Sequence, residues 1–124
     1  MMPKILIIED EADAAMLLEK RLSKNGFEVL TANGVPESIE LLQKEKIDLV
    51  ILDLMLPAGG GVTVLKSLRG NMRTSGIPVV VLTASHSPGY KQRVLDEGVN
   101  AYMEKPYDPV ELINTIKNLL KKNK

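Results

Sequence analysis

The sequence Leu49-Val50-Ile51-Leu52-Asp53-Leu54-Met55-Leu56-Pro57 is a continuous apolar run that contains one carboxylate and stops at a proline. A run of this kind is typical of a strand that is buried on both faces of a parallel sheet. Open parallel sheets place their binding and catalytic groups just beyond the carboxyl ends of the strands. Because Asp53 stands at such an end, we expect its carboxylate to have a chemical role.

A second group of carboxylates follows the first apolar run of the chain. Ile5-Leu6-Ile7-Ile8 leads directly into Glu9, Asp10 and Glu11, which would bring more acids to the edge of the sheet where Asp53 lies. Like charges in a partly desolvated pocket repel one another unless a cation lies among them. The pattern therefore predicts a metal ion at this edge.

Composition limits both the fold and the partners. The 124 residues, 44% of them hydrophobic, suffice for one domain over residues 1–124, with a core at about 4–121. Sixteen basic and sixteen acidic residues cancel, so the net charge indicates neither nucleic acid nor an anionic membrane as a direct partner. The absence of cysteine excludes disulfides and thiolate metal sites and is typical of a reducing compartment. No apolar run approaches the roughly 20 residues of a membrane span, so we expect a soluble, cytoplasmic chain.

Short apolar runs alternate with segments of helical period along the chain. Such alternation is typical of an α/β fold with a parallel sheet, right-handed crossovers and helices on both faces. We predict a five-stranded parallel sheet, doubly wound with five helices, for which the strand order 2-1-3-4-5 is the leading candidate. Asp108 is the expected cap of the last helix. The predicted strands are residues 4–8, 28–32, 49–53, 78–83 and 101–103.

Two further polar residues end predicted strands. Val79-Val80-Val81-Leu82 leads to Thr83, and Tyr102-Met103-Glu104 leads to Lys105. In the proposed order the first, third, fourth and fifth strands are neighbours, so Thr83 and Lys105 would meet the acids that follow the first and third strands. This convergence of polar groups from distant parts of the sequence is the strongest sign of a functional site.

These residues and their spacing resemble the receiver domain of two-component response regulators over nearly the whole chain. The resemblance implies a flavodoxin-like receiver fold, similar to that of chemotaxis regulators, and it supports the proposed strand order. It also implies a cis peptide bond between Lys105 and Pro106. The matching motifs are Ile8-Glu9-Asp10-Glu11, Asp53 with Pro57 and Gly61, Thr83-Ala84, Gly98 and Tyr102-Met103-Glu104-Lys105-Pro106-Tyr107.

The resemblance implies that Asp53 accepts a phosphoryl group from a histidine kinase or a histidine phosphotransfer protein. An aspartate can attack phosphorus to give an acyl phosphate, and the transfer needs mainly positioning and neutralisation of charge. Magnesium suits this chemistry because it takes hard oxygen ligands. By the resemblance, Mg²⁺ would be held by Asp10 and Asp53 directly, by Glu9 directly or through water, and by the backbone carbonyl of Met55.

The resemblance also implies a conformational switch. Lys105 would pair with one phosphate oxygen, and the Thr83 hydroxyl would donate a hydrogen bond to another. In this family the threonine shift is associated with inward rotation of an aromatic residue at the position of Tyr102. The face of the fourth helix, fifth strand and fifth helix would then bind a downstream effector protein or domain. The sequence leaves open whether this face also forms a phosphorylation-dependent homodimer.

Two positions depart from the commonest pattern of the family. Glu9 stands where an aspartate is more usual, and its extra methylene moves the carboxylate outward, which favours a water-mediated contact with the metal. Gly60 stands where many receivers have an aspartate, so we expect this loop to lose an anchoring side chain and to gain backbone freedom.

Each site residue also has a purely structural interpretation. Glu9 and Asp10 could simply start the first helix, and Lys105 could be a solvated lysine in a turn. Thr83 could be a strand-favouring residue, and Tyr102 could be half-buried near the edge of the sheet without switching. The order and spacing of the whole set favour the functional interpretation.

Three function classes remain. We favour a signalling phosphoacceptor that is not an enzyme towards other substrates and catalyses only its own phosphorylation and dephosphorylation. The second class is a phosphatase with an aspartyl-phosphate intermediate, but such enzymes generally carry an acid two positions after the nucleophile, where this chain has Met55. The third is a scaffold that binds partners without phosphorylation, and the complete set of pocket residues argues against it.

Overall fold

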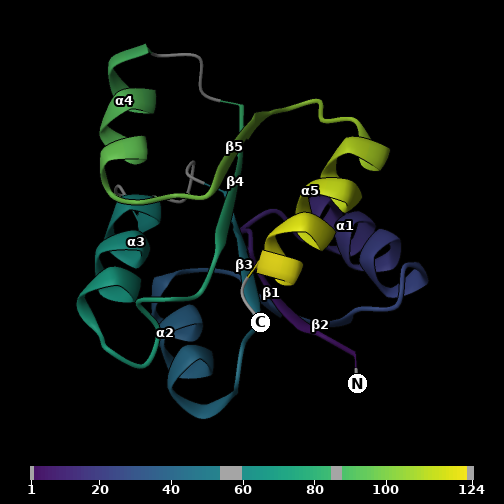
Figure 1. Cartoon of the computed structure of the whole chain (residues 1–124), viewed down its shortest axis with the longest axis horizontal. Helices are drawn as coiled ribbons and strands as arrows, with labels where there is room; N and C mark the ends of the chain where they lie inside the picture. The colour runs from purple at the N-terminus through teal and green to yellow at the C-terminus, as the bar shows by residue number, and fades with distance from the viewer. Residues whose placement is uncertain (1, 54–59, 85–87, 123–124) are drawn as a thin grey trace.

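The predicted alternation of strands and helices is confirmed by the structure, a computed structural model that describes residues 2–53, 60–84 and 88–122 (Figure 1). The described strands are parallel and form a sheet in the predicted order, β2-β1-β3-β4-β5. The strands are β1 (Lys4–Ile8), β2 (Glu28–Ala32), β3 (Leu49–Leu52), β4 (Val79–Thr83) and β5 (Ala101–Glu104). The helices are α1 (Ala12–Lys24), α2 (Val35–Lys44), α3 (Gly60–Gly70), α4 (Pro88–Asp96) and α5 (Pro109–Lys122).

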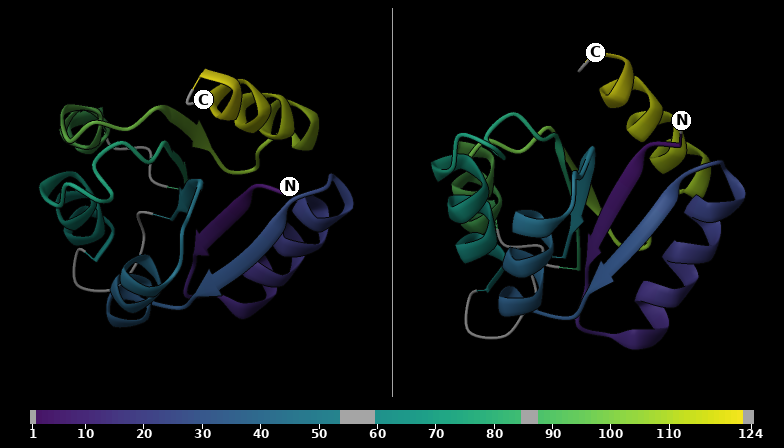
Figure 2. Two further views of the ribbon diagram at one scale, coloured as in Figure 1. Left: turned by 60° about the horizontal axis from the view of Figure 1, so that its bottom comes forward. Right: turned by 90° about the horizontal axis from the view of Figure 1, so that it is seen from below.

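The helices form two layers, one on each face of the sheet (Figure 2). Helices α1 and α5 cover one face, where Leu22 and Ile116 share a core with Ile7 of β1. Helices α2, α3 and α4 cover the other face, where Leu65 shares a core with Leu6 of the same strand. Alternate residues of a strand therefore enter opposite cores, which explains the uninterrupted apolar runs. Within the described residues, every helix is too short or too polar to cross a lipid bilayer.

Strand β3 lies in the centre of the sheet, and all of its residues are buried. It ends at Leu52, one residue earlier than predicted. The backbone N–H of Asp53 nevertheless donates to the carbonyl oxygen of Ile8 at 3.0 Å, so the first residue after the strand stays tied to β1. Strand β4 begins one residue later than predicted, because Pro78 has no N–H to donate to the ladder. Strand β5 extends to Glu104, which pairs in register with Thr83.

Local signals at the helix ends act as predicted. The Asp108 Oδ1 atom accepts hydrogen bonds from the backbone N–H groups of Val110 at 2.8 Å and Glu111 at 3.3 Å, which confirms it as the cap of α5. The Lys105–Pro106 peptide bond is cis, as the resemblance implied. Gly26, which follows α1, has a φ of 88°, a left-handed conformation that glycine adopts without a steric penalty.

At the edge of the sheet where the strands begin, which we call the amino edge, the segments beside β4 and β5 are held by hydrogen bonds between side chains and the backbone. Arg69 of α3 donates to the carbonyl oxygens of Ile77 at 2.7 Å and Gly98 at 2.6 Å. The Asn100 side-chain oxygen accepts from the backbone N–H of Val79 at 2.8 Å. These contacts fix the segments that lead into β4 and β5.

Candidate functional site

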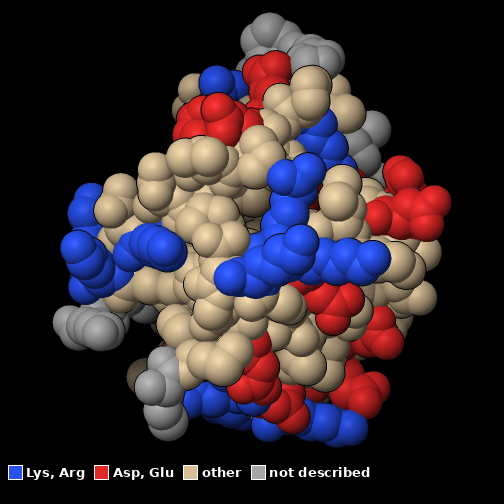
Figure 3. All heavy atoms as spheres, turned by 90° about the vertical axis from the view of Figure 1, so that its right-hand side faces the viewer, with Lys and Arg blue, Asp and Glu red and all other residues tan. Residues whose placement is uncertain are grey.

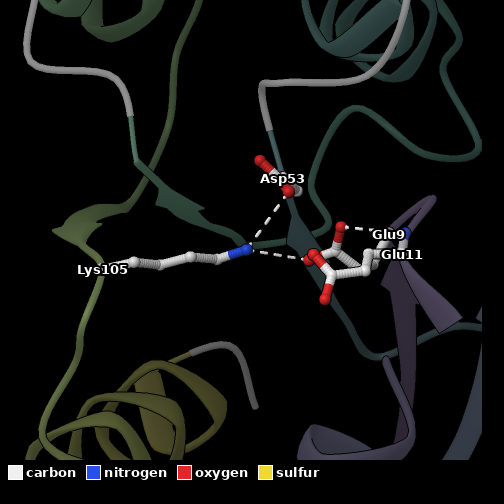
Figure 4. Close-up of polar contacts among 4 residues, drawn as sticks. All are labelled: Glu9, Glu11, Asp53 and Lys105. Carbon is white, nitrogen blue, oxygen red and sulfur yellow. Dashed lines mark hydrogen bonds and ion pairs between the residues drawn. The ribbon is translucent and has the colours of Figure 1, made fainter. Parts of the chain in front are cut away.

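Polar side chains from three strands meet at the opposite edge of the sheet, the carboxyl edge (Figure 4). Glu9 follows β1, Asp53 follows β3 and Lys105 follows β5. The Lys105 Nζ atom lies 2.8 Å from Glu9 Oε1 and 3.2 Å from Asp53 Oδ2, so one ammonium group pairs with both acids. The strand order thus brings together residues that are far apart in the sequence, as predicted.

The three acids that were predicted to hold a metal also lie together. Carboxylate oxygens of Glu9, Asp10 and Asp53 are within 4.8 Å of one another. Glu9 and Asp53 are only 8% and 7% exposed, whereas Asp10 is exposed. Carboxylates are hard oxygen donors, and Mg²⁺ commonly binds one or two of them together with water and phosphate. The donor set therefore fits Mg²⁺.

Burial and charge act together on Glu9 and Lys105. Burial raises the pKa of Glu9, the nearby Asp53 carboxylate raises it further, and Lys105 opposes both effects. Burial would lower the pKa of Lys105, but its pairing with Glu9 and Asp53 outweighs burial and raises that pKa. The lysine therefore stays protonated at neutral pH. Its ammonium group supplies part of the positive charge that the sequence had led us to assign to a metal alone. The three carboxylate ligands, and not repulsion among the acids, therefore support Mg²⁺ at this site.

The predicted switch residues lie on β4, which pairs with β3, and on β5, which pairs with β4. Thr83 is fully buried at the end of β4, and its backbone oxygen accepts a hydrogen bond from the Lys105 N–H at 2.9 Å. Tyr102 of β5 is half-buried and packs against the core under α2, α3 and α4. The ammonium group of Lys91, on α4, lies 5.1 Å from the centre of the Tyr102 ring. Thr83 is thus joined to the lysine by backbone, and Tyr102 contacts α4.

Two contacts at the site were not predicted from the sequence. The backbone N–H of Glu11 donates to Glu9 Oε2 at 3.3 Å, which orients the carboxylate that pairs with Lys105. The second contact joins Lys91 of α4 to Tyr102 of β5. Neither contact could be recognised from residue types in the sequence. The first depends on the conformation of the turn after β1, and the second depends on the distance between α4 and β5.

Other sequence predictions concern the segment between β3 and α3. Met55, predicted to offer a backbone carbonyl to the metal, lies outside the described residues. Gly60 is the first residue of α3 and is buried, so it belongs to the helix rather than to the loop in which we had expected it.

Known proteins are similar to this chain in sequence and in structure. The family model described as response regulator receiver domain matches residues 5–117. The phosphate regulon transcriptional regulatory protein PhoB of Escherichia coli (strain K12) is 35% identical over 119 residues, which cover 96% of this chain and 52% of that protein. The chain spans about half the length of the curated relatives it matches.

Solved structures give the same result. A response regulator receiver domain protein (CheY-like) from Methanospirillum hungatei JF-1 superposes with a TM-score of 0.92 at 25% identity, over 99% of this chain and 97% of that one. The receiver domain of the Francisella response regulator 1452 has a TM-score of 0.89 at 30% identity, over 98% of this chain and 99% of that one.

Proposed function

The chain belongs to the response regulator receiver domain family, and on this premise we propose that Asp53 accepts a phosphoryl group from the phosphohistidine of a histidine kinase or a histidine phosphotransfer protein. An Asp53 oxygen would form a bond to phosphorus while the phosphorus–nitrogen bond breaks, and the imidazole would keep the electron pair and take up a proton. The observation that carries this proposal is the pairing of a buried Asp53 carboxylate with Lys105, beside a second buried acid, at the end of the central strand.

The acids would hold Mg²⁺, and the lysine would hold the transferred group. When bound to Glu9, Asp10 and Asp53, Mg²⁺ would neutralise charge on the phosphoryl oxygens. Lys105 now divides its contacts between Glu9 and Asp53. A phosphoryl group on Asp53 adds negative charge and acceptor oxygens, which would compete for the ammonium group. After phosphorylation, the Lys105 ammonium group would therefore bind the phosphoryl group, and no other basic side chain would have to move into the site.

Thr83 and Tyr102 would carry this change to the surface. Thr83 is bonded through its backbone oxygen to the Lys105 N–H, and Tyr102 contacts Lys91 of α4. Movement of Lys105 and Thr83 towards a phosphoryl group would thus alter the packing of Tyr102 against α4. We propose that an effector protein or domain binds the face of α4, β5 and α5, and that the chain catalyses only its own phosphorylation and dephosphorylation.

The phosphoacceptor is tested with Mg²⁺ and acetyl phosphate as the phosphodonor. Intact mass should show a gain of one phosphoryl group in the parent chain and none in Asp53→Asn, because an amide cannot attack phosphorus as a carboxylate does. Chelation of Mg²⁺ should reduce labelling of the parent. Equal labelling of the two proteins would assign the nucleophile to another residue.

The role of the lysine is tested by Lys105→Ala. This variant should still accept phosphate to some degree, because Asp53 and the acids remain, but it should fail to switch. The readout is the NMR signal of the Tyr102 ring before and after phosphorylation, which should change in the parent and stay unchanged in the variant. A full response in Lys105→Ala would refute the proposed role.

A further inference from the structure

The charges of the chain cancel in sum but are unevenly distributed. The face of the molecule that carries α1 and α5 shows Lys and Arg side chains in a band across its middle (Figure 3). A groove of about 440 Å³ lies on this face, between the last turn of α1 and the first turns of α5. Its charged lining residues are Arg21, Lys24 and Lys117, and no carboxylate of the described residues lines it. The groove is therefore a local positive site in a protein of zero net charge.

The cations of the groove have no counter-ion within the described part of the chain. Arg21, Lys24 and Lys117 take no part in its ion pairs. The Arg21 Nε atom is buried and makes no hydrogen bond to any described residue. The Arg21 Nε atom is thus a buried donor without an acceptor among the described residues. A carboxylate brought from outside would be its first charged partner, and guanidinium–carboxylate pairs are among the stronger hydrogen-bonded contacts in proteins.

The groove also has an apolar side, which is formed by the first turns of α5. Pro109, Val110 and Ile113 line it, and Val110 is 69% exposed. An aliphatic side chain placed over Val110 and Ile113 would remove apolar surface from water. Charged groups alone would leave this surface uncovered, so the lining is suited to a ligand that combines carboxylates with aliphatic groups.

We propose that this groove binds an acidic peptide segment of a partner protein. Its carboxylates would pair with Arg21, Lys24 and Lys117, and an aliphatic side chain would cover Val110 and Ile113. Single-stranded nucleic acid fits less well, because its recognition uses aromatic stacking platforms together with a basic groove, and the lining has no aromatic residue. The groove lies on the α1 side of α5 and Asp53 does not line it, so this partner would bind without phosphorylation.

The probe is a fluorescein-labelled peptide in which glutamates flank leucines, titrated with the full chain and followed by fluorescence anisotropy. The double variant Lys24→Glu/Lys117→Glu should weaken binding at least about tenfold, because two attractive contacts become repulsive. Val110→Ser should weaken binding about fivefold through lost apolar contact. The matched control is Lys46→Glu/Lys66→Glu, which reverses two exposed charges away from the groove and should bind as the parent does.

Several outcomes would overturn the proposal. Equal loss in the two double variants would show attraction by net charge alone. Binding of poly-glutamate or of a single-stranded oligonucleotide as tightly as the leucine-containing peptide would show that the apolar side is not used. A dimer of the parent chain that Lys24→Glu/Lys117→Glu dissociates would assign the groove to a second copy. Asp53→Asn should bind the peptide as the parent does, so failure of the phosphoacceptor proposal can be told apart from failure of this one.

Discussion

Beside β4 and β5, the amino edge and the carboxyl edge of the sheet hold their polar side chains by different kinds of contact, although Lys4 at the amino end of β1 also pairs with the side chains of Glu28 and Glu45. At the amino edge, Arg69 and Asn100 bond to backbone atoms of the segments that enter β4 and β5. At the carboxyl edge, Lys105 bonds to the side chains of Glu9 and Asp53. A backbone carbonyl that accepts from Arg69 cannot leave it unless the whole segment moves. The carboxylates that accept from Lys105 are side chains, so a phosphate oxygen could take their place. The contacts of Arg69 and Asn100 thus maintain the fold, whereas the side-chain contacts of Lys105 can be exchanged for contacts with a ligand.

The substitution Arg69→Ala removes the side chain that bonds to both backbone segments at the amino edge. We expect the free energy of unfolding to fall by about 3 kcal/mol, because charged hydrogen bonds are lost and the carbonyls of Ile77 and Gly98 lose their donor. Urea unfolding measures the change. Lys66→Ala, at an exposed position of the same helix, should stay within about 0.5 kcal/mol of the parent. A loss below about 1 kcal/mol in Arg69→Ala would show that other contacts hold this edge.

Adding Mg²⁺ tests whether the acids at the carboxyl edge bind a ligand while the amino edge stays unchanged. At ten times its dissociation constant, Mg²⁺ should raise the free energy of unfolding by about 1.4 kcal/mol, as expected of an ion that binds only the folded state. Asp10→Asn should lose most of this gain because it removes a carboxylate from the acidic cluster, whereas Asp13→Asn, on the exposed first turn of α1, should keep it. If hydrogen exchange changed equally at the amino edge on adding Mg²⁺, the proposed division between the edges would be wrong.

The smallest expected effect is the pH dependence that Glu9 contributes. Burial, with Asp53 nearby, raises its folded-state pKa above the ordinary 4.5 despite Lys105. The folded protein therefore binds this proton more readily than the unfolded chain, so Glu9 lowers stability as the pH rises from 4.5 through the folded-state pKa. Without Mg²⁺, the unfolding free energy of Glu9→Gln should therefore rise relative to that of the parent as the pH rises from 4.5 to neutral. Urea unfolding at both ends of that range checks this, and a difference that does not vary with pH would contradict it.

Much of the fold could be predicted because the strands are buried on both faces. The unbroken apolar runs that include Leu49–Leu52 and Val79–Leu82 gave the positions of β3 and β4 to within one residue, and the alternation with helices gave the parallel sheet. The strand order then placed Glu9, Asp53 and Lys105 at one edge. This succeeded because the end of a strand fixes where the next residue lies, whatever its side chain does.

Contacts that depend on side-chain reach could not be predicted in the same way. The sequence predicted a metal among the acids, but whether the Lys105 ammonium would also extend to Glu9 and Asp53 depends on its side-chain conformation. Arg69 bonds to carbonyl oxygens in two separate segments, and every residue has such an oxygen, so no pattern of residue types marks the contact. The groove beside Arg21 likewise follows from how α1 and α5 pack, not from the spacing of its residues.

The hydrogen bond from the Asp53 N–H to the Ile8 carbonyl, at 3.0 Å, has a practical consequence. Any replacement at position 53 except proline keeps this amide donor, so the new side chain starts from the same point on the backbone. Since the chain contains no cysteine, Asp53→Cys would introduce a single thiol at that point. Its rate of alkylation would then report how accessible position 53 is from solvent, with no background labelling to subtract.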